Sequence, residues 1–225
     1  MKISVMMAAA ALLASCAGQP AGKTPSSTST PLTEGETIRL VTPARTGGKT
    51  IDEALWLRRT SREYSAEQLS LEELSGVVWA AAGINRPQDN RLTAPSALAL
   101  YPIRLYVFLP GGVYAYDAVN HRLDRILEGD HRNVSGTQDF VGTAPVNLVY
   151  IADRSVYDGR DIPAAHIDYL CGQDAAGYAE NVNLYAGGHD LKAVTRGSAP
   201  KEVLLALLGL DAERYGFALA QTVGK

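Results

Sequence analysis

Residues 169–191 predict one long helix, and the small residues along it restrict how the rest of the chain can pack. Apolar side chains run through this segment, and glycine or alanine recurs at positions 172, 175, 176, 177, 179 and 186. Because small side chains let neighbouring elements approach closely and pack densely, we expect this helix to lie at the centre of the fold.

The strand signals lie mainly before this helix. Residues 103–109 are rich in β-branched and aromatic side chains, and after a Pro-Gly-Gly turn residues 113–117 predict the second arm of a hairpin. We also predict a short strand at 121–125, a fully buried strand at 146–152 and a closing strand at 217–220. The pattern predicts an α+β fold, with helices packed on a mostly antiparallel sheet.

Four further helical segments are predicted, at residues 51–59, 70–83, 94–100 and 199–208. The second has the clearest start, because Ser70 followed three residues later by Glu73 has the spacing of a capping box. Trp56 and Trp79 fall on helix faces, where we expect them to contribute to the core.

The first fifteen residues predict a signal peptide. A single Lys2 precedes an apolar run that is too short to span a bilayer. Leu-Ala-Ser-Cys follows and resembles the lipobox of bacterial lipoproteins, so we expect cleavage before Cys16 and acylation of its thiol. Ala17 after the cysteine favours delivery to the periplasmic face of the outer membrane, in the cell envelope. An ordinary secretory signal with a chance cysteine is the alternative.

Residues 16–50 form the second part of the chain, the lipidated cysteine and a tether. Glycine, proline, serine and threonine dominate the stretch from 18 to 37, which has too few apolar residues to fold and is expected to be flexible. Residues 38–40 could add a short strand before the first helix. The remaining part, residues 51–225, has about 175 residues and is long enough for one domain with a single core.

Composition argues against several partners and sites. The formal net charge of -3 provides no basic field for nucleic acid. The four histidines at 121, 131, 166 and 189 show no metal-ligand spacing, so no metal site is predicted. Cys171 lies within the long helix and is expected to be a small buried hydrophobic residue rather than a nucleophile.

One short stretch carries a chemical signal. Residues 58–62 read Arg-Arg-Thr-Ser-Arg, which places three guanidinium groups and two hydroxyls at the end of a predicted helix. Guanidinium groups bind phosphate through paired hydrogen bonds, so the stretch indicates a site for a phosphate-bearing cofactor. A solvated basic turn is the alternative.

Three segments resemble the nitroreductase family of flavoproteins. Arg-Arg-Thr-Ser-Arg-Glu-Tyr at 58–64 is similar to the family's opening motif, and Pro-Ser-Ala-Leu-Ala-Leu-Tyr-Pro at 95–102 is close to a block found in its azoline-dehydrogenase subgroup. Residues 177–184 are similar to the family's Gly-x-x-x-Gln-Asn helix. The resemblance implies a nitroreductase-like fold over residues 51–225, bound FMN, and a homodimer whose interface builds the flavin pocket.

The resemblance also assigns binding roles to residues. It implies that the FMN phosphate and ribityl chain are bound by Arg58, Arg59, Thr60 and Arg62, that one flavin edge is lined by Pro95 and Ser96, and that the isoalloxazine is approached by the backbone of Arg196 and Gly197. Many relatives continue into a basic segment where this chain has Lys225, which could contact the phosphate instead. No catalytic side chain is assigned, because the cofactor carries the chemistry.

The sequence departs from the family pattern in three places. Leu98 replaces a glycine of the subgroup, Glu180 replaces the usual glutamine, and His-Asp-Leu at 189–191 replaces Leu-Gly-Leu. These changes leave a second hypothesis open, a surface-tethered binding protein with a weakened flavin site. The subgroup block leaves a third, azoline oxidation, which the signal peptide opposes because that chemistry usually needs cytoplasmic partner enzymes.

The leading hypothesis is therefore an FMN-dependent oxidoreductase. The resemblance implies a ping-pong cycle in which a donor reduces the flavin and a small-molecule acceptor, such as a quinone or a nitroaromatic compound, reoxidises it. Because NAD(P)H is scarce outside the cytoplasm, we expect an exported enzyme to take its electrons from a membrane partner or another donor.

Overall fold

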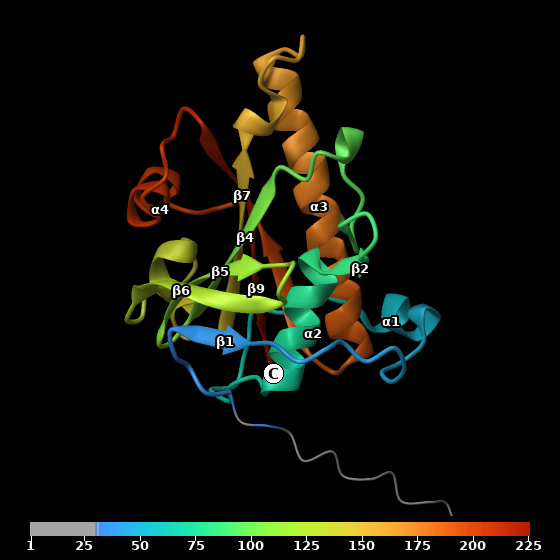
Figure 1. Ribbon diagram of the computed structural model, residues 1–225. Coiled ribbons are helices and arrows are strands. Elements are labelled where there is room, and N and C mark those ends of the chain that lie inside the picture. The colour runs from blue at the N-terminus through green and yellow to red at the C-terminus, as the bar shows by residue number, and fades with distance from the viewer. Residues whose placement is uncertain (1–29, 31) are drawn as a thin grey trace, which may run out of the picture.

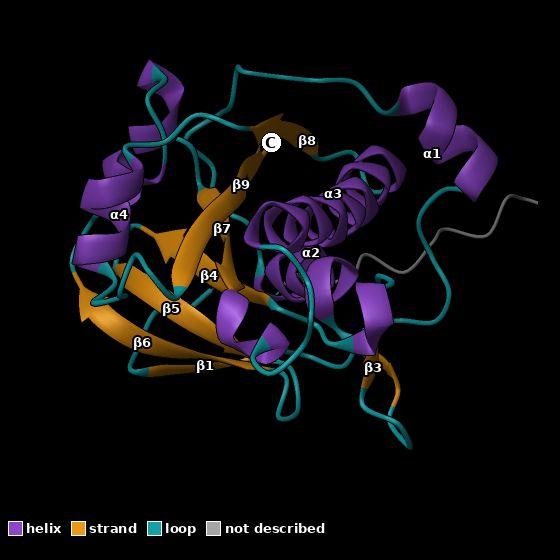
Figure 2. Ribbon diagram, turned by 90° about the horizontal axis from the view of Figure 1, so that it is seen from above, coloured by secondary structure: helices purple, strands orange, loops and turns teal. Residues whose placement is uncertain are grey.

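The computed structural model describes Thr30 and residues 32–225. The predicted signal peptide, Cys16 and the first half of the predicted tether lie outside the described residues. The described chain is built on a seven-stranded sheet in the order β1-β6-β5-β4-β7-β9-β8, in which every neighbouring pair is antiparallel. Helices cover both faces of this sheet (Figure 1; Figure 2). The predicted α+β class and its mostly antiparallel sheet are confirmed.

Most strands lie close to their predicted positions, and three strands were not predicted. Their bounds are β1 Thr37–Arg39, β2 Ile84–Arg86, β3 Arg91–Leu92, β4 Ile103–Leu109, β5 Gly112–Asp117, β6 Arg122–Glu128, β7 Val146–Asp153, β8 Lys192–Arg196 and β9 Tyr215–Gly224. The predicted hairpin is β4 and β5, and the fully buried strand is β7. Strands β2, β3 and β8 were not predicted, and β2 and β3 form a separate two-stranded sheet.

The helices confirm the capping signal read from the sequence. Their bounds are α1 Ile51–Leu57, α2 Leu71–Ala82, α3 Ala164–Gly188 and α4 Lys201–Leu207, with 3-10 turns at Ala97–Ala99, Arg132–Ser135, Asp139–Gly142 and Arg154–Tyr157. The Ser70 hydroxyl accepts a hydrogen bond from the backbone N–H of Glu73, and the Glu73 carboxylate accepts one from the Ser70 N–H. Gly83 ends this helix, as predicted.

Helix α3 is central, as its small residues predict. It lies with α2 over one face of the sheet, where Tyr178, Ala179 and Val182 are buried in the larger core (Figure 2). Helix α4 covers the opposite face, and its Leu204 belongs to a second core around Phe108 of β4. None of the described helices combines the length and the apolar character that a membrane span requires.

Two local predictions were wrong. Trp56 is 91% exposed rather than buried, because α1 packs against α3 and buries only Ala54. The segment 94–100 is not a regular helix, because Leu98 and Ala99 have φ values of 55°, in the left-handed region, and only a 3-10 turn forms there.

Strand β1 joins the sheet through β6 and buries Ile38. The short strand predicted near residues 38–40 is therefore confirmed. It lies N-terminal to Ile51, where the sequence places the start of the folded domain.

Candidate active site

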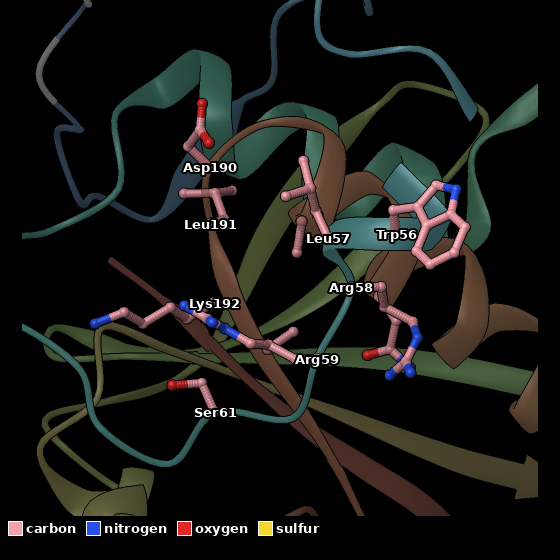
Figure 3. Close-up of a pocket in the computed structure, with 12 residues that line it drawn as sticks. Trp56, Leu57, Arg58, Arg59, Ser61, Asp190, Leu191 and Lys192 are labelled. Carbon is pink, nitrogen blue, oxygen red and sulfur yellow. The ribbon is translucent and has the colours of Figure 1, made fainter. Parts of the chain in front are cut away.

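A cavity of about 340 Å³ lies where the end of α1, the last turns of α3 and strand β8 meet (Figure 3). Helix α1 and the segment after it contribute Trp56, Leu57, Arg58, Arg59 and Ser61. Helix α3, β8 and the turn between them contribute Asn183, Ala186, Gly187, Asp190, Leu191, Lys192 and Ala193. The cavity therefore contains part of the arginine stretch that the sequence singled out.

The arginine stretch is held in place by β8. After α1 ends at Leu57, the chain runs beside that strand, with a parallel bridge between Thr60 and Ala193. The backbone N–H of Ser61 donates to the carbonyl of Ala193 at 3.0 Å. Successive side chains of extended backbone point to opposite sides, and Arg58 and Arg59 extend in different directions (Figure 3).

A glycine on α3 sets how closely α1 approaches. A Cβ at Gly187 would lie 3.0 Å from the carbonyl oxygen of Ala54 and 3.2 Å from the backbone nitrogen of Arg58. That nitrogen donates to the Ala54 carbonyl at 2.8 Å, which ends the helix. A larger residue at Gly187 would push α1 away, so this contact fixes where Arg58 enters the cavity.

The charges at the cavity favour an anion. Arg58, Arg59 and Lys192 are exposed cations in its lining, whereas Asp190 is paired with Lys49 at 2.6 Å. Ser61 adds a hydroxyl. Guanidinium and ammonium groups beside a hydroxyl are the donors that phosphate prefers, so the residues present fit the phosphate end of FMN.

A buried polar network supports the opposite wall. The Tyr150 hydroxyl donates to Gln221 Oε1 at 2.5 Å, and Gln221 Nε2 donates to Asn183 Oδ1 at 3.0 Å and to Thr195 Oγ1 at 3.1 Å. Tyr150 and Gln221 have no exposed surface. The network holds Asn183 at the cavity, and sequence reasoning missed it because Tyr150 and Gln221 are far apart in the chain.

The predicted site residues Arg62 and Lys225 lie outside the cavity lining. Arg62 is exposed and follows Ser61 directly. The Lys225 ammonium lies 2.7 Å from a Glu67 carboxylate oxygen and 3.1 Å from one of Glu73. These two carboxylates raise the pKa of Lys225, and the hydrogen bond to Glu67 has the larger effect.

Pro95 and Ser96 also lie elsewhere on the same chain. The Ser96 hydroxyl donates to Asp174 on α3, and Pro95 packs near Gly177. The part of this helix that lines the cavity lies further along, at Asn183, Ala186 and Gly187. Nine residues separate Asp174 from Asn183, a rise of about 14 Å along a helix, so Pro95 and Ser96 do not line the cavity of their own chain.

Arg196 and Gly197 follow the end of β8. The Arg196 guanidinium is buried and donates to three uncharged acceptors, Thr222 Oγ1 at 3.1 Å, the Ser135 carbonyl at 2.9 Å and Asn147 Oδ1 at 3.2 Å. Burial lowers the pKa of Arg196 to about 10. The side chain is thus occupied inside the fold, whereas Gly197 is exposed and its backbone is free to face a ligand.

The comparison with known families decides the classification. Residues 57–225 match the nitroreductase family, so the match includes the whole arginine stretch. The chain belongs to the nitroreductase family. The nitroreductase-like fold expected from the sequence is confirmed.

Among the described residues, no group of three histidine, cysteine, aspartate or glutamate side chains is placed to hold a metal ion.

Two relatives above 30% identity agree with this assignment, and a third structure shares the fold. A candidate nitroreductase of Methanocaldococcus jannaschii is 31% identical over 162 residues, which cover 66% of this chain and 78% of that protein. A crystal structure of a candidate nitroreductase from Ralstonia eutropha is 36% identical, with a TM-score of 0.79 over 88% of this chain and 93% of that one. A candidate nitroreductase of Desulfovibrio desulfuricans, solved with FMN, is 23% identical, with a TM-score of 0.55 over 79% and 87%.

Proposed function

We propose that this nitroreductase-family protein is an FMN-dependent oxidoreductase. The observation that carries the proposal is the cavity lined by Arg58, Arg59, Lys192 and Ser61, because this donor set suits the phosphate of FMN. Family membership supports a flavin-dependent oxidoreductase in general. The FMN complex of a structural relative supports flavin as the cofactor.

The chain's own residues bind and orient the cofactor. Arg58 and Arg59 in the cavity lining would hold the phosphate of FMN, with Thr60 and Arg62 of the same stretch beside them for the ribityl chain. The exposed backbone at Gly197 would face the isoalloxazine. Bound FMN supplies hydride and electron transfer, so the protein needs no acid–base pair for that step. The acceptor is a planar small molecule, such as a quinone or a nitroaromatic compound.

Steady-state kinetics test this reaction. Initial rates measured with varied donor at several fixed acceptor concentrations should give parallel double-reciprocal lines, the pattern of ping-pong transfer. Comparing NADH, NADPH and a reduced quinone analogue as donors identifies the electron source. A protein that holds FMN but transfers electrons from none of these donors to any acceptor would contradict the proposal and favour a tethered binding protein.

We also propose that the functional unit is a homodimer. Pro95 and Ser96 do not line the cavity of their own chain, so we assign this flavin edge to a second copy. Helix α1 exposes an apolar patch beside the cavity, made of Ile51, Leu55, Trp56 and Leu57. Clustered exposed apolar residues mark interaction surfaces, and a two-fold dimer would cover this patch.

Sedimentation analysis tests the dimer. The wild-type protein should sediment as a dimer, and Trp56→Glu should yield monomers with weakened FMN binding, because a carboxylate in an apolar interface is costly. Val119→Glu is the matched control, since Val119 is 73% exposed and lies in the turn between β5 and β6. A monomeric wild-type protein that binds FMN fully would contradict the proposal.

The N-terminal assignments remain part of the proposal. We propose that the protein is exported, acylated at Cys16 and held in the cell envelope by this lipid. Labelling of cells with tagged palmitate should mark the wild-type protein but not Cys16→Ser, which should leave the membrane fraction. Cys171→Ser is the control, because Cys171 is the buried free cysteine of the described chain. Equal labelling of Cys16→Ser and wild type would contradict lipidation.

A further inference from the structure

The loop that carries Ser96 has an unusual backbone. Leu98, Ala99 and Tyr101 have φ values of 55°, 55° and 50°, so three non-glycine residues adopt the left-handed region within four positions. In that region the Cβ of an L-residue comes too close to its own backbone. Such strain persists only where surrounding contacts hold it, and it often accompanies binding sites.

One carboxylate on α3 supplies these contacts. Asp174 Oδ2 accepts a hydrogen bond from the Ser96 hydroxyl at 2.5 Å, and Oδ1 accepts one from the Ala97 N–H at 3.0 Å. The Ser96 oxygen in turn accepts from the Tyr101 N–H at 2.8 Å. Asp174 therefore connects α3 with both the beginning and the end of the strained loop.

The environment of Asp174 argues for a role beyond packing. The residue is only 4% exposed, and no described basic side chain pairs with it. A buried carboxylate is costly unless hydrogen bonds stabilise its charge. Here the stabilising donors all come from the loop and its serine, so the energy of this carboxylate depends on the shape of the loop.

We propose that Asp174 is a positioning residue that fixes Ser96 and the strained loop in the conformation that contacts the flavin edge. This inference rests on the proposed function, in which Ser96 lines that edge. Leu98 increases the strain that the contacts of Asp174 hold, because a leucine occupies a left-handed position in this chain where the subgroup has glycine. A glycine would adopt this backbone conformation without strain, whereas Leu98 is held in it by the contacts of Asp174.

The first test uses the flavin-free protein. Amide hydrogen exchange should show the Ala97 and Tyr101 N–H groups protected in wild type and exchanging about tenfold faster or more in Asp174→Ala, because both lose their hydrogen-bonding network. Asp174→Asn keeps an acceptor for the Ala97 N–H and should retain protection there. Asp168→Ala is the matched control on α3, since Asp168 pairs with Arg154 and not with the loop. Unchanged protection in Asp174→Ala would overturn the inference.

The second test measures FMN affinity. Asp174→Ala should weaken FMN binding by about tenfold, and adding Leu98→Gly should recover most of the loss, since glycine removes the strain that Asp174 opposes. If Asp174 only supported the packing of α3, Leu98→Gly would restore nothing, and that result would overturn the inference. If Asp174→Ala fails to fold, Asp174→Asn carries the test, with affinity near that of wild type expected.

The two tests separate the two proposals. Wild-type protein that binds no FMN would overturn the proposed function, and the role of Asp174 at a flavin site with it, whatever the exchange result. Wild-type protein that binds FMN, together with loop amides that exchange faster in Asp174→Ala while FMN affinity stays unchanged, would overturn the positioning role alone. Faster exchange with weaker binding, rescued by Leu98→Gly, is the expected result.

Discussion

Gly136 lies directly against the guanidinium of Arg196, and a Cβ at position 136 would overlap with Nη1. The backbone of Gly136 is extended, so any residue could adopt it, and the close approach of the side chain alone explains the glycine. This contact matters because the buried Arg196 directly precedes Gly197, the residue whose backbone we assign to the flavin.

We predict that Gly136→Ala displaces the Arg196 guanidinium from its three acceptors. The free energy of unfolding should fall by about 1–3 kcal/mol, the usual cost of overpacking a buried position. Urea unfolding followed by circular dichroism measures it. Gly142→Ala is the control, because its Cβ would meet Asn133 at an ordinary 3.6 Å and should change stability by less than about 0.5 kcal/mol. Equal effects of the two substitutions would contradict this account.

Leu98→Gly should stabilise the protein. The left-handed backbone costs a leucine about 1–2 kcal/mol, which glycine avoids. Part of this gain in folding free energy is offset because glycine gives the unfolded chain more conformational entropy. Removing the Leu98 side chain costs little packing, because it is exposed. The net gain should be up to about 1 kcal/mol in thermal or urea unfolding. Ala176→Gly, at an exposed position in the middle of α3, should instead destabilise by about 1 kcal/mol. Similar losses in both variants would refute the strain at Leu98.

His121 should make stability depend on pH. Its Nδ1 lies 2.9 Å from the Tyr116 hydroxyl, and its Nε2 lies 3.0 Å from the Val41 carbonyl. Burial lowers the pKa of His121 below its usual value near 6.5, although the hydrogen bond to Val41 opposes the shift. As the pH falls, the unfolded chain binds this proton at a higher pH than the folded protein does. The stability that neutral His121 contributes is therefore complete above about pH 7 and is lost as the pH falls through its folded pKa.

Unfolding free energies measured from about pH 8 down to about pH 5 test this prediction. Wild-type stability should decrease over the range, and His121→Gln should show a smaller decrease, because glutamine does not titrate. A decrease of equal size in both proteins would show that other groups cause the pH dependence.

Local signals predicted much of the fold. Ser70 and Glu73 fix the start of α2 through contacts three residues apart, and the turn between β4 and β5 is equally local. Strand β8 was missed because its five residues are defined by pairing with β9 and by the bridge from Thr60. Trp56 was misjudged because a helical period does not show which face of α1 has a neighbour.

The candidate site likewise combines residues that local sequence signals predicted with residues that only the fold brings in. Arg58 and Arg59 were predicted because they are adjacent in the sequence and form one cationic stretch. Lys192 and Asn183 join them only through the packing of α1, α3 and β8, which no local pattern records. The strain at Leu98 was also not predicted, because the sequence of residues 94–100 is compatible with a regular helix. Only the fold places Asp174 beside this loop.

The visible absorption spectrum of the purified protein tests the central claim most directly. Protein beginning at Gly18, purified without added flavin and then incubated with FMN, should show a flavin band at about 450 nm. Arg58→Ala with Arg62→Ala should lose the band, whereas Arg39→Ala with Arg45→Ala, an equal change of charge at exposed positions, should keep it. A folded wild-type protein that stays colourless and binds no added FMN would contradict the account.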